Sequence, residues 1–241
     1  MAYKKPFSTA EYASRLADVQ GRMRAAGFDL LICQDPANMG WLTGFDGWSF
    51  YTPQCVVVAA NEDWPIWFGR AQDAKSAHFT TDLPAQNIVG FSEPLVQHPV
   101  NHPYDELCDL IRQKGWHKSR IGVELDAHYY TARAHQHLVA GLQEAKIEDC
   151  KELVNWARLV KSPAEVDLMR EQASSVLHLD VVEGVSLAWG LPGWSQLTAR
   201  LPEPVTRSVL QTFDWLARRA PTWADVVLIA GRPRRLATTS A

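Results

Sequence analysis

The stretch from Asp35 to Tyr51 crowds aromatic side chains between glycines, in the order Asp-Pro-Ala-Asn-Met-Gly-Trp-Leu-Thr-Gly-Phe-Asp-Gly-Trp-Ser-Phe-Tyr. Glycines allow sharp backbone turns, and aromatic faces stack on small ring-shaped molecules and shield them from water. The segment is too rich in glycine for us to expect a regular helix or strand. We interpret it either as a plug of the hydrophobic core or as a wall of a substrate pocket. The side chains that need a packing partner are Trp41, Phe45, Trp48, Phe50 and Tyr51.

Two other sets of residues have types and spacings that chemistry uses. Glu124 and Asp126 alternate at the end of an expected strand and form a candidate carboxylate pair. The interpretation that we favour for them is structural, as an ion pair or as a cap for the next helix. His98 and His102 are spaced like metal ligands, but flanking prolines predict an extended backbone there. We therefore predict no metal site in this chain and can assign no catalytic residue.

The remaining histidine and cysteine patterns favour structural roles. His135 and His137 lie in an expected helix, where side chains two residues apart point to different faces, so we predict that both are solvated. Cys33 and Cys55 lie in apolar, strand-like runs and are predicted to be small buried thiols. The chain has no close cysteine pair, no P-loop, no dinucleotide fingerprint and no nucleophile elbow.

The bulk composition limits the kind of partner. The chain has 241 residues, 46% of them hydrophobic, and a net charge of −3. These values are typical of a globular protein and indicate neither nucleic acid nor a membrane as a partner. The short basic run at 232–235 is interpreted as a solvated terminus. The start of the sequence has no long apolar run after its lysines, so we expect neither a signal peptide nor an anchor, and a cytoplasmic location.

The elements that must position these residues alternate between strands and helices, which predicts an α/β fold. A capping pattern at Ser8–Glu11 begins a helix that Gly27 ends. Two apolar runs joined by a short turn predict a hairpin, and a hairpin among crossover units predicts a mixed sheet flanked by helices. Expected strands are 28–33, 55–60, 65–68, 87–91, 121–125 and 147–150; expected helices are 71–79, 104–114, 131–142 and 152–160.

A boundary falls at Lys161-Ser-Pro-Ala-Glu165, where serine caps a new helix and proline takes its first position. We divide the chain into a domain at 1–160, the start of a linker helix at 161–177 and an atypical tail at 178–241. The tail contains arginine but no lysine, and it is rich in proline and tryptophan. We expect it to be largely irregular, with one helix at 207–219 and one strand at 225–230.

Three motifs resemble one known family. Asn38–Tyr51, with Asp-Gly-Trp-Ser-Phe-Tyr at its end, is similar to the Asn-Tyr-Leu-Thr-Gly type of segment in the creatinase/prolidase superfamily, and closest to its ectoine hydrolase branch. Arg120–Asp126 resembles the family's Ile-Gly-Val-Glu-x-Asp strand. Ala157–Arg170 contains the Arg-x-x-Lys-Ser-Pro-x-Glu pattern that leads into the catalytic domain of the family. The resemblance covers about the first 175 residues.

The resemblance implies an N-terminal domain that caps a catalytic domain and often joins a dimer, with loops that can reach the partner's active site. On that reading Trp48, Phe50 and Tyr51 are candidates for closing a pocket around a small ring-bearing substrate. The competing reading is that these aromatic side chains only hold a dimer together. The implied partners are a second copy of the chain or a full-length homologue.

The chain departs from the family after the linker. The metal-dependent relatives use two divalent cations held by two Asp, one His and two Glu, and the cations lower the pKa of a bridging water. After His178 no histidine remains, so neither this ligand set nor the catalytic histidine of the creatinase branch can be assigned. We interpret residues 178–241 either as a frame-disrupted tail or as a short genuine module.

The resulting hypothesis is a truncated member of a hydrolase family that cleaves C–N bonds of small molecules or Xaa-Pro peptides. An ectoine-type substrate is favoured, and we expect this chain alone to be inactive and to hold no cofactor. A small-molecule substrate is expected only if a catalytic domain is supplied. The alternative is a non-catalytic module for dimerisation or interaction.

Overall fold

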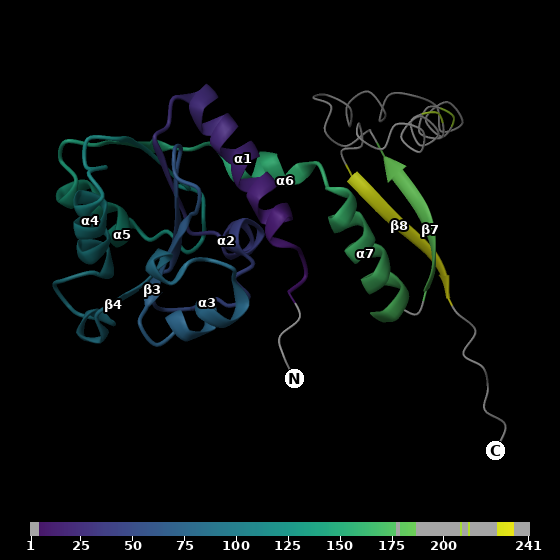
Figure 1. The fold of residues 1–241 in the computed structure, drawn as a ribbon, viewed down its shortest axis with the longest axis horizontal. Helices are drawn as coiled ribbons and strands as arrows, with labels where there is room; N and C mark the ends of the chain where they lie inside the picture. The colour runs from purple at the N-terminus through teal and green to yellow at the C-terminus, as the bar shows by residue number, and fades with distance from the viewer. Residues whose placement is uncertain (1–4, 177–178, 187–207, 209–211, 213–225, 234–241) are drawn as a thin grey trace, which may run out of the picture. The chain divides into compact units, whose positions relative to one another are not determined.

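The computed structural model describes residues 5–176, 179–186, 208, 212 and 226–233. The chain divides into two compact units, Met1–Ala157 and Arg158–Ala241, and each is described here by itself. The first unit contains a six-stranded sheet with helices on both of its faces (Figure 1). The described residues of the second include the helix α7 and a two-stranded sheet.

The six-stranded sheet has the order β4-β3-β2-β1-β5-β6. β1 pairs antiparallel with β2 and parallel with β5, β2 pairs antiparallel with β3, and the outer pairs β3–β4 and β5–β6 are parallel. The predicted α/β fold with a mixed sheet and a hairpin is therefore confirmed. The strands are β1 Leu30–Cys33, β2 Cys55–Ala59, β3 Ile66–Arg70, β4 Ile88–Phe91, β5 Arg120–Val123 and β6 Lys146–Asp149.

Alternate residues of the strands supply two separate cores. In β1, Leu31 and Cys33 pack on one face of the sheet, whereas Leu30 and Ile32 pack on the other. The first face is covered by α1 Thr9–Ala26, α2 Pro36–Thr43, α3 Ala74–Thr80 and α6 Leu153–Leu159. The second is covered by α4 Pro103–Gln113 and α5 Ala132–Gly141 (Figure 1). Two short 3₁₀ turns, Ala85–Asn87 and Glu93–Leu95, flank β4.

The first helix has the start and the end that the sequence predicts. Ser8 is the N-cap of α1 and its hydroxyl accepts a hydrogen bond from the backbone N–H of Glu11, 3.3 Å away. The Glu11 carboxylate pairs with Arg15, 3.1 Å away, so of the expected capping box the Ser8 half is the one that forms. Gly27 ends the helix in the left-handed conformation, with φ of 76°.

The aromatic segment is more regular than its glycines suggest, because Pro36–Thr43 forms α2. The Asp35 carboxylate caps this helix by accepting from the backbone N–H groups of Ala37 and Asn38. The prediction that no helix forms here is wrong, because one glycine inside a helix is tolerated when capping and packing compensate for it. Gly44, with φ of 78°, then ends α2.

After Gly44 the segment divides into a buried and an exposed part. Phe45 is buried and its ring lies 5.2 Å from that of Trp67. Trp48, Phe50 and Tyr51 are instead exposed. The core-plug interpretation therefore applies to Phe45, and the last three aromatic side chains face solvent.

The second unit begins with α7, Pro163–Val176. Ser162 and Glu165 cap it reciprocally, since each side chain accepts a hydrogen bond from the other's backbone N–H. Residues 179–186, predicted to be irregular, form β7 Leu179–Ser186, which pairs antiparallel with β8 Val226–Pro233. The strand predicted at 225–230 corresponds to β8. The predicted helix at 207–219 lies outside the described residues except for positions 208 and 212.

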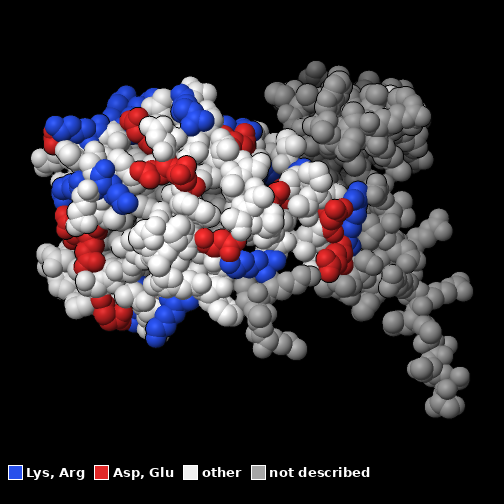
Figure 2. Space-filling view, viewed as in Figure 1, with Lys and Arg blue, Asp and Glu red and all other residues white. Residues whose placement is uncertain are grey.

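The surface gives no sign of one dominant charge on the face drawn in Figure 2, where acidic and basic side chains are interspersed over the described residues. No helix within the described ranges has both the length and the apolar character needed to span a membrane.

Candidate functional site

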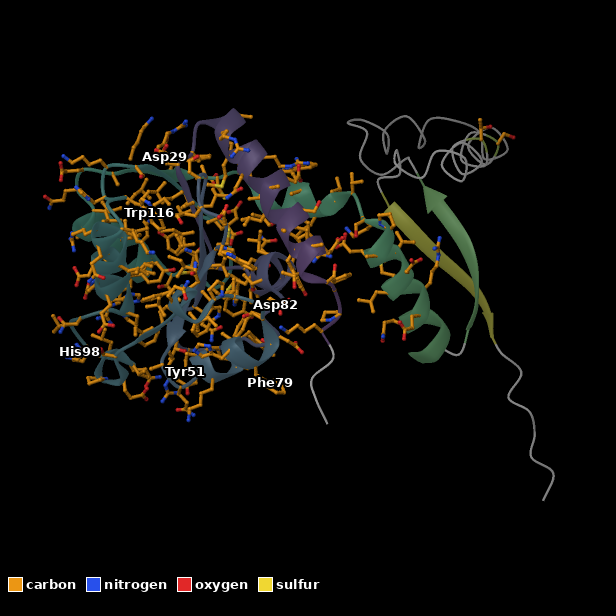
Figure 3. All side chains as sticks on the ribbon, viewed as in Figure 1. Asp29, Tyr51, Phe79, Asp82, His98 and Trp116 are labelled. Atoms are coloured by element: carbon orange, nitrogen blue, oxygen red, sulfur yellow. The ribbon has the colours of Figure 1, made fainter. Side chains whose placement is uncertain are left out.

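A cavity of about 410 Å³ lies at the edge of the sheet where β1 ends and β2 begins. Its lining comes from the exposed aromatic segment, from the loop that leads into α4 and from the turn that begins α5. Figure 3 shows two of its lining residues, Tyr51 and His98, at the same end of the first unit. The volume is within the range of small-molecule sites, about 300–1,000 Å³.

The aromatic wall of this cavity is made of Trp48, Phe50, Tyr51 and Tyr129. The ring of Trp48 lies 3.9 Å from that of Phe50 and 5.6 Å, edge to face, from that of Tyr129. Phe50 is 78% exposed and Tyr51 is 59% exposed. The Tyr51 hydroxyl accepts a hydrogen bond from Arg70, 3.2 Å away, and Arg70 also pairs with Glu93. The wall is thus partly anchored, while its rings remain free to contact another molecule.

The polar floor of the cavity includes Gln34, which directly follows β1 and is only 2% exposed. Its amide nitrogen donates to the Tyr104 hydroxyl, 3.1 Å away, and its amide oxygen has no hydrogen-bond partner in the protein. Tyr104 is the one partner of the side-chain amide among the described residues, so either orientation of the amide leaves one end unpaired. A buried polar atom without a partner costs about 1–3 kcal/mol.

His102 also lines this cavity and is the N-cap of α4. Its Nδ1 accepts a hydrogen bond from the backbone N–H of Tyr104, 3.1 Å away. Burial, with the positive charges of His137 and Arg133, lowers the pKa of His102 to about 4. The ring is therefore neutral at pH 7 and carries its proton on Nε2, which can donate to an acceptor.

Arg133, near the start of α5, supplies the positive charge of the lining. Its guanidinium donates to the backbone carbonyls of His98, 3.0 Å away, and Asn101, 3.3 Å away. Of the described residues that line this cavity, none is aspartate or glutamate. The arginine therefore keeps a charge that no carboxylate of the lining neutralises.

Glu124, predicted to be structural, is buried and directly follows β5. Its carboxylate accepts from the backbone N–H groups of Gln34, 2.6 Å away, and Asp35, 2.8 Å away, and from the Asn38 amide. Burial raises the pKa of Glu124, although these hydrogen bonds oppose the shift. Because β1 and β5 are parallel, their ends meet here, so Glu124 holds the start of α2 rather than capping the next helix.

A second cavity of about 480 Å³ has Glu124 in its lining. Asp126, the partner in the candidate carboxylate pair, is exposed and lines this second cavity. Its acidic lining residues are Asp35, Glu124, Asp126, Asp149 and Glu152. Across the described part of the chain, no group of three or more His, Cys, Asp or Glu side chains could hold a metal ion. The described residues therefore do not fit the two-cation set that the resemblance implies for the intact relatives.

The histidines are placed differently from the solvated pair that was predicted. His137 accepts or donates at Nδ1 to the Asp105 carboxylate, 2.7 Å away, and its ring stacks on that of His102 at 5.0 Å. His135 pairs with the Tyr130 hydroxyl, 3.0 Å away. Asp105 belongs to α4, so the packing of α5 against α4 gives His137 its partner, whereas His135 is paired by the turn that precedes its own helix. The Nδ1 of His98 accepts hydrogen bonds from the backbone N–H groups of Val100 and Asn101.

The fold places this molecule among the prolidase-type α/β domains. The crystal structure of a proline dipeptidase from Streptococcus pneumoniae superposes on it with a TM-score of 0.50 at 19% identity, covering 61% of this chain and 98% of that one. Residues 15–160 match the Creatinase/Prolidase N-terminal domain, and the chain belongs to the creatinase/prolidase family.

Two curated relatives have higher sequence identity. Ectoine hydrolase of Halomonas elongata is 41% identical over 190 residues, which are 78% of this chain and 47% of that protein. An uncharacterized hydrolase/peptidase of Sinorhizobium fredii is 41% identical over 165 residues, which are 68% of this chain and 42% of that protein. The chain thus spans less than half the length of these relatives. The match shows a shared family and does not cover the whole of either relative.

Sequence reasoning did not find Gln34, His102 and Arg133 as parts of one site. They follow β1, precede α4 and begin α5, and only the folded sheet brings these ends together. The one usable signal was that polar residues after buried strands of an α/β fold gather at one edge of the sheet.

Proposed function

We propose that this chain is the N-terminal part of a hydrolase that cleaves a C–N bond in a small molecule. An ectoine-type substrate is favoured, and Xaa-Pro peptides are the second choice. The observation that carries the proposal is the 41% identity to a protein named ectoine hydrolase over 78% of this chain. Fold likeness to a proline dipeptidase supports the broader class but does not distinguish the two substrates.

In this proposal Trp48, Phe50 and Tyr51 form a wall of the substrate pocket. They line a cavity, they are exposed, and two of them are in ring contact, which suits a small ring-bearing molecule. The groups that activate water belong to a catalytic domain outside the described residues. The contribution of this unit is to enclose the substrate and exclude water from it.

The proposal further holds that this chain alone does not hydrolyse substrate. The test is an assay of the purified chain with ectoine and with an Xaa-Pro dipeptide, in the presence of Mn²⁺ or Co²⁺. We expect no turnover above that of the buffer with metal alone. Turnover that depends on the protein and on the metal would refute this part of the proposal.

The second candidate is an interaction module that pairs with another copy or with a full-length homologue. Exposure of Phe50, Tyr51 and Trp48 favours it, since exposed aromatic side chains are enriched at protein interfaces. Size-exclusion chromatography with light scattering, of the chain alone and mixed with a full-length homologue, tests it. Monomer elution in both samples would reject this candidate.

The proposed partners are thus a small molecule and a protein, and not nucleic acid or a membrane, as the net charge of −3 favours. All four cysteines are free and buried. Because thiols stay reduced in the cytoplasm, we propose that the protein works there. Cell fractionation that placed it in an oxidising compartment would contradict this.

A further inference from the structure

We infer that Arg70 is a positioning residue of the candidate site, which holds Tyr51 of the aromatic wall in place relative to a second segment of the lining. Arg70 ends β3 and is not itself among the described residues that line the cavity. Its effect on substrate rests on the proposed function, in which the wall encloses that substrate. Its effect on the order of the wall does not, because that order is a property of the chain alone.

Arg70 connects two segments that both contribute to the lining. One is 48–54, which carries the aromatic wall, and the other is 95–103, which leads from the turn Glu93–Leu95 to the start of α4. The Nη1 of Arg70 donates to the Tyr51 hydroxyl, 3.2 Å away. Its Nε donates to both carboxylate oxygens of Glu93, each 3.0 Å away, and its Nη2 donates to one of them. One guanidinium thus sets the spacing between Tyr51 and the turn that precedes the second segment.

The pair with Glu93 fixes the direction in which the guanidinium points. Because β3 and β4 are parallel and Arg70 pairs with Phe91, Glu93 lies just beyond the end of the neighbouring strand. A planar fork that binds both oxygens of one carboxylate has a defined orientation as well as a defined distance. Hydrogen bonding from Arg70 lowers the pKa of the Glu93 carboxyl, so this partner is charged at neutral pH. The remaining donor, Nη1, is therefore held toward Tyr51.

Tyr51 depends on this contact more than the rest of the wall does. The other three rings of the wall are linked by ring contacts with one another. Within the described ranges, Arg70 is the one hydrogen-bond partner of the Tyr51 hydroxyl, and no other ring contacts the Tyr51 ring. The backbone nearby is held separately, since the N–H of Thr52 donates to the Ser49 hydroxyl, 3.2 Å away. Loss of Arg70 should therefore release the side chain of Tyr51 and leave the turn in place.

The contact also determines the role in which the Tyr51 hydroxyl is used. A phenol oxygen accepts hydrogen bonds and donates one of its own. Because the guanidinium is the donor here, the Tyr51 hydroxyl keeps its hydrogen for an acceptor on a bound molecule. Successive hydrogen bonds polarise one another, so the cationic donor makes the hydroxyl a better donor in turn. Arg70 thus sets both the place of the ring and the direction of its next hydrogen bond.

The first test measures the order of the Tyr51 side chain in the full chain, by ¹³C NMR relaxation of labelled tyrosine rings. The signal is assigned by its absence from the spectrum of Tyr51→Phe. We expect the order parameter to fall from about 0.8 to below about 0.6 in Arg70→Met. Arg70→Lys should show the same fall, because a single ammonium nitrogen cannot bind the carboxylate and the hydroxyl from separate atoms. Unchanged order in either variant would overturn the inference.

The matched control is Arg22→Met, since Arg22 forms an ion pair with Asp18 in α1, 3.0 Å away, and is not among the described lining residues. This variant should leave the order of Tyr51 unchanged. Arg22→Met and Arg70→Met should both keep the midpoint of urea unfolding within about 0.5 M of the natural chain, because ion pairs at the surface contribute little to stability. A larger fall for Arg70→Met would show that Arg70 supports the fold as a whole, and would count against a role in positioning.

The second test uses a fusion in which residues 1–176 of this chain replace the matching region of Halomonas elongata ectoine hydrolase. Arg70→Met should raise the KM for ectoine about tenfold and leave kcat within about threefold, because an ordered wall acts on binding. Arg70→Met combined with Tyr51→Phe should be no worse than Arg70→Met alone, because Arg70 acts through the Tyr51 hydroxyl. Additive losses in the double variant would overturn the inference.

Failure of the proposed function would give a different pattern of results. If the fusion hydrolyses no substrate but Arg70→Met releases the Tyr51 side chain in the full chain, the positioning role stands and the hydrolase proposal fails. If the fusion is active and Arg70→Met changes neither the order of Tyr51 nor KM, the positioning role alone fails.

Discussion

Replacing Glu124 by alanine tests the idea that one buried carboxylate holds the start of α2 and the floor of the cavity. The side chain accepts three hydrogen bonds, from the backbone N–H groups of Gln34 and Asp35 and from the Asn38 amide. In the variant, the buried Gln34 N–H is left without a partner, which costs about 1–3 kcal/mol. Asn38 keeps its hydrogen bond to Asn155, 2.5 Å away, so its loss is smaller, about 1 kcal/mol.

The losses at Gln34 and Asn38 destabilise the variant, and removal of a buried charge offsets a part of them. The net prediction is that Glu124→Ala lowers the free energy of unfolding by about 3 kcal/mol. The assay is urea unfolding at pH 7, followed by NMR signals of β1 and β5 so that only the six-stranded sheet is monitored. Asp126→Ala is the control, since Asp126 is exposed and lies two residues away. It should change stability by less than about 0.5 kcal/mol. A cost for Glu124→Ala as small as that of the control would refute the structural role.

Further predictions concern single positions whose neighbours are known. The pKa of His102 is lowered to about 4, below its unfolded value of about 6.5, so the free energy of unfolding should fall as the pH drops from 6.5 to 4. His102→Asn keeps an N-cap side chain and should reduce that fall, measured by urea unfolding at several pH values. The control variant His78→Asn, at an exposed position, should not reduce it. Gly44→Ala should lower the free energy of unfolding by about 2 kcal/mol or more, because φ is +78° and the new Cβ would lie 2.7 Å from the Tyr12 hydroxyl. Gly21→Ala, where a Cβ within α1 meets open space, should instead raise the midpoint of thermal unfolding. Phe50→Ala should leave the free energy of unfolding within about 0.5 kcal/mol of the natural chain, and a larger loss in urea unfolding would mean that Phe50 packs in the fold.

The sheet was predictable because its central strands are short apolar runs with clear stops. The hairpin of β2 and β3 and the capped start of α7 follow directly from residue types. α2 was missed because Asp35, Pro36 and the core contacts of Met39 and Leu42 outweigh the glycine within it.

The cavity was only partly predictable. Trp48, Phe50 and Tyr51 attract attention in the sequence because three aromatic residues so close together directly after a glycine-rich stretch are unusual. Gln34 and Arg133 do not, since a glutamine after a strand and an arginine near a helix start are ordinary in sequence. Their significance depends on a missing hydrogen bond and on the absence of acids from the described lining, and both are properties of the folded chain.

The most direct test of the account uses a fusion in which residues 1–176 of this chain replace the matching region of Halomonas elongata ectoine hydrolase. Phe50→Ala is compared with Phe79→Ala, which changes an equally aromatic, exposed residue of α3 that does not line the cavity. We expect the fusion to hydrolyse ectoine, and we expect Phe50→Ala to lower kcat/KM by about tenfold or more while Phe79→Ala does not. Equal kcat/KM values for the two variants would contradict the claim that the aromatic wall of this domain encloses the substrate.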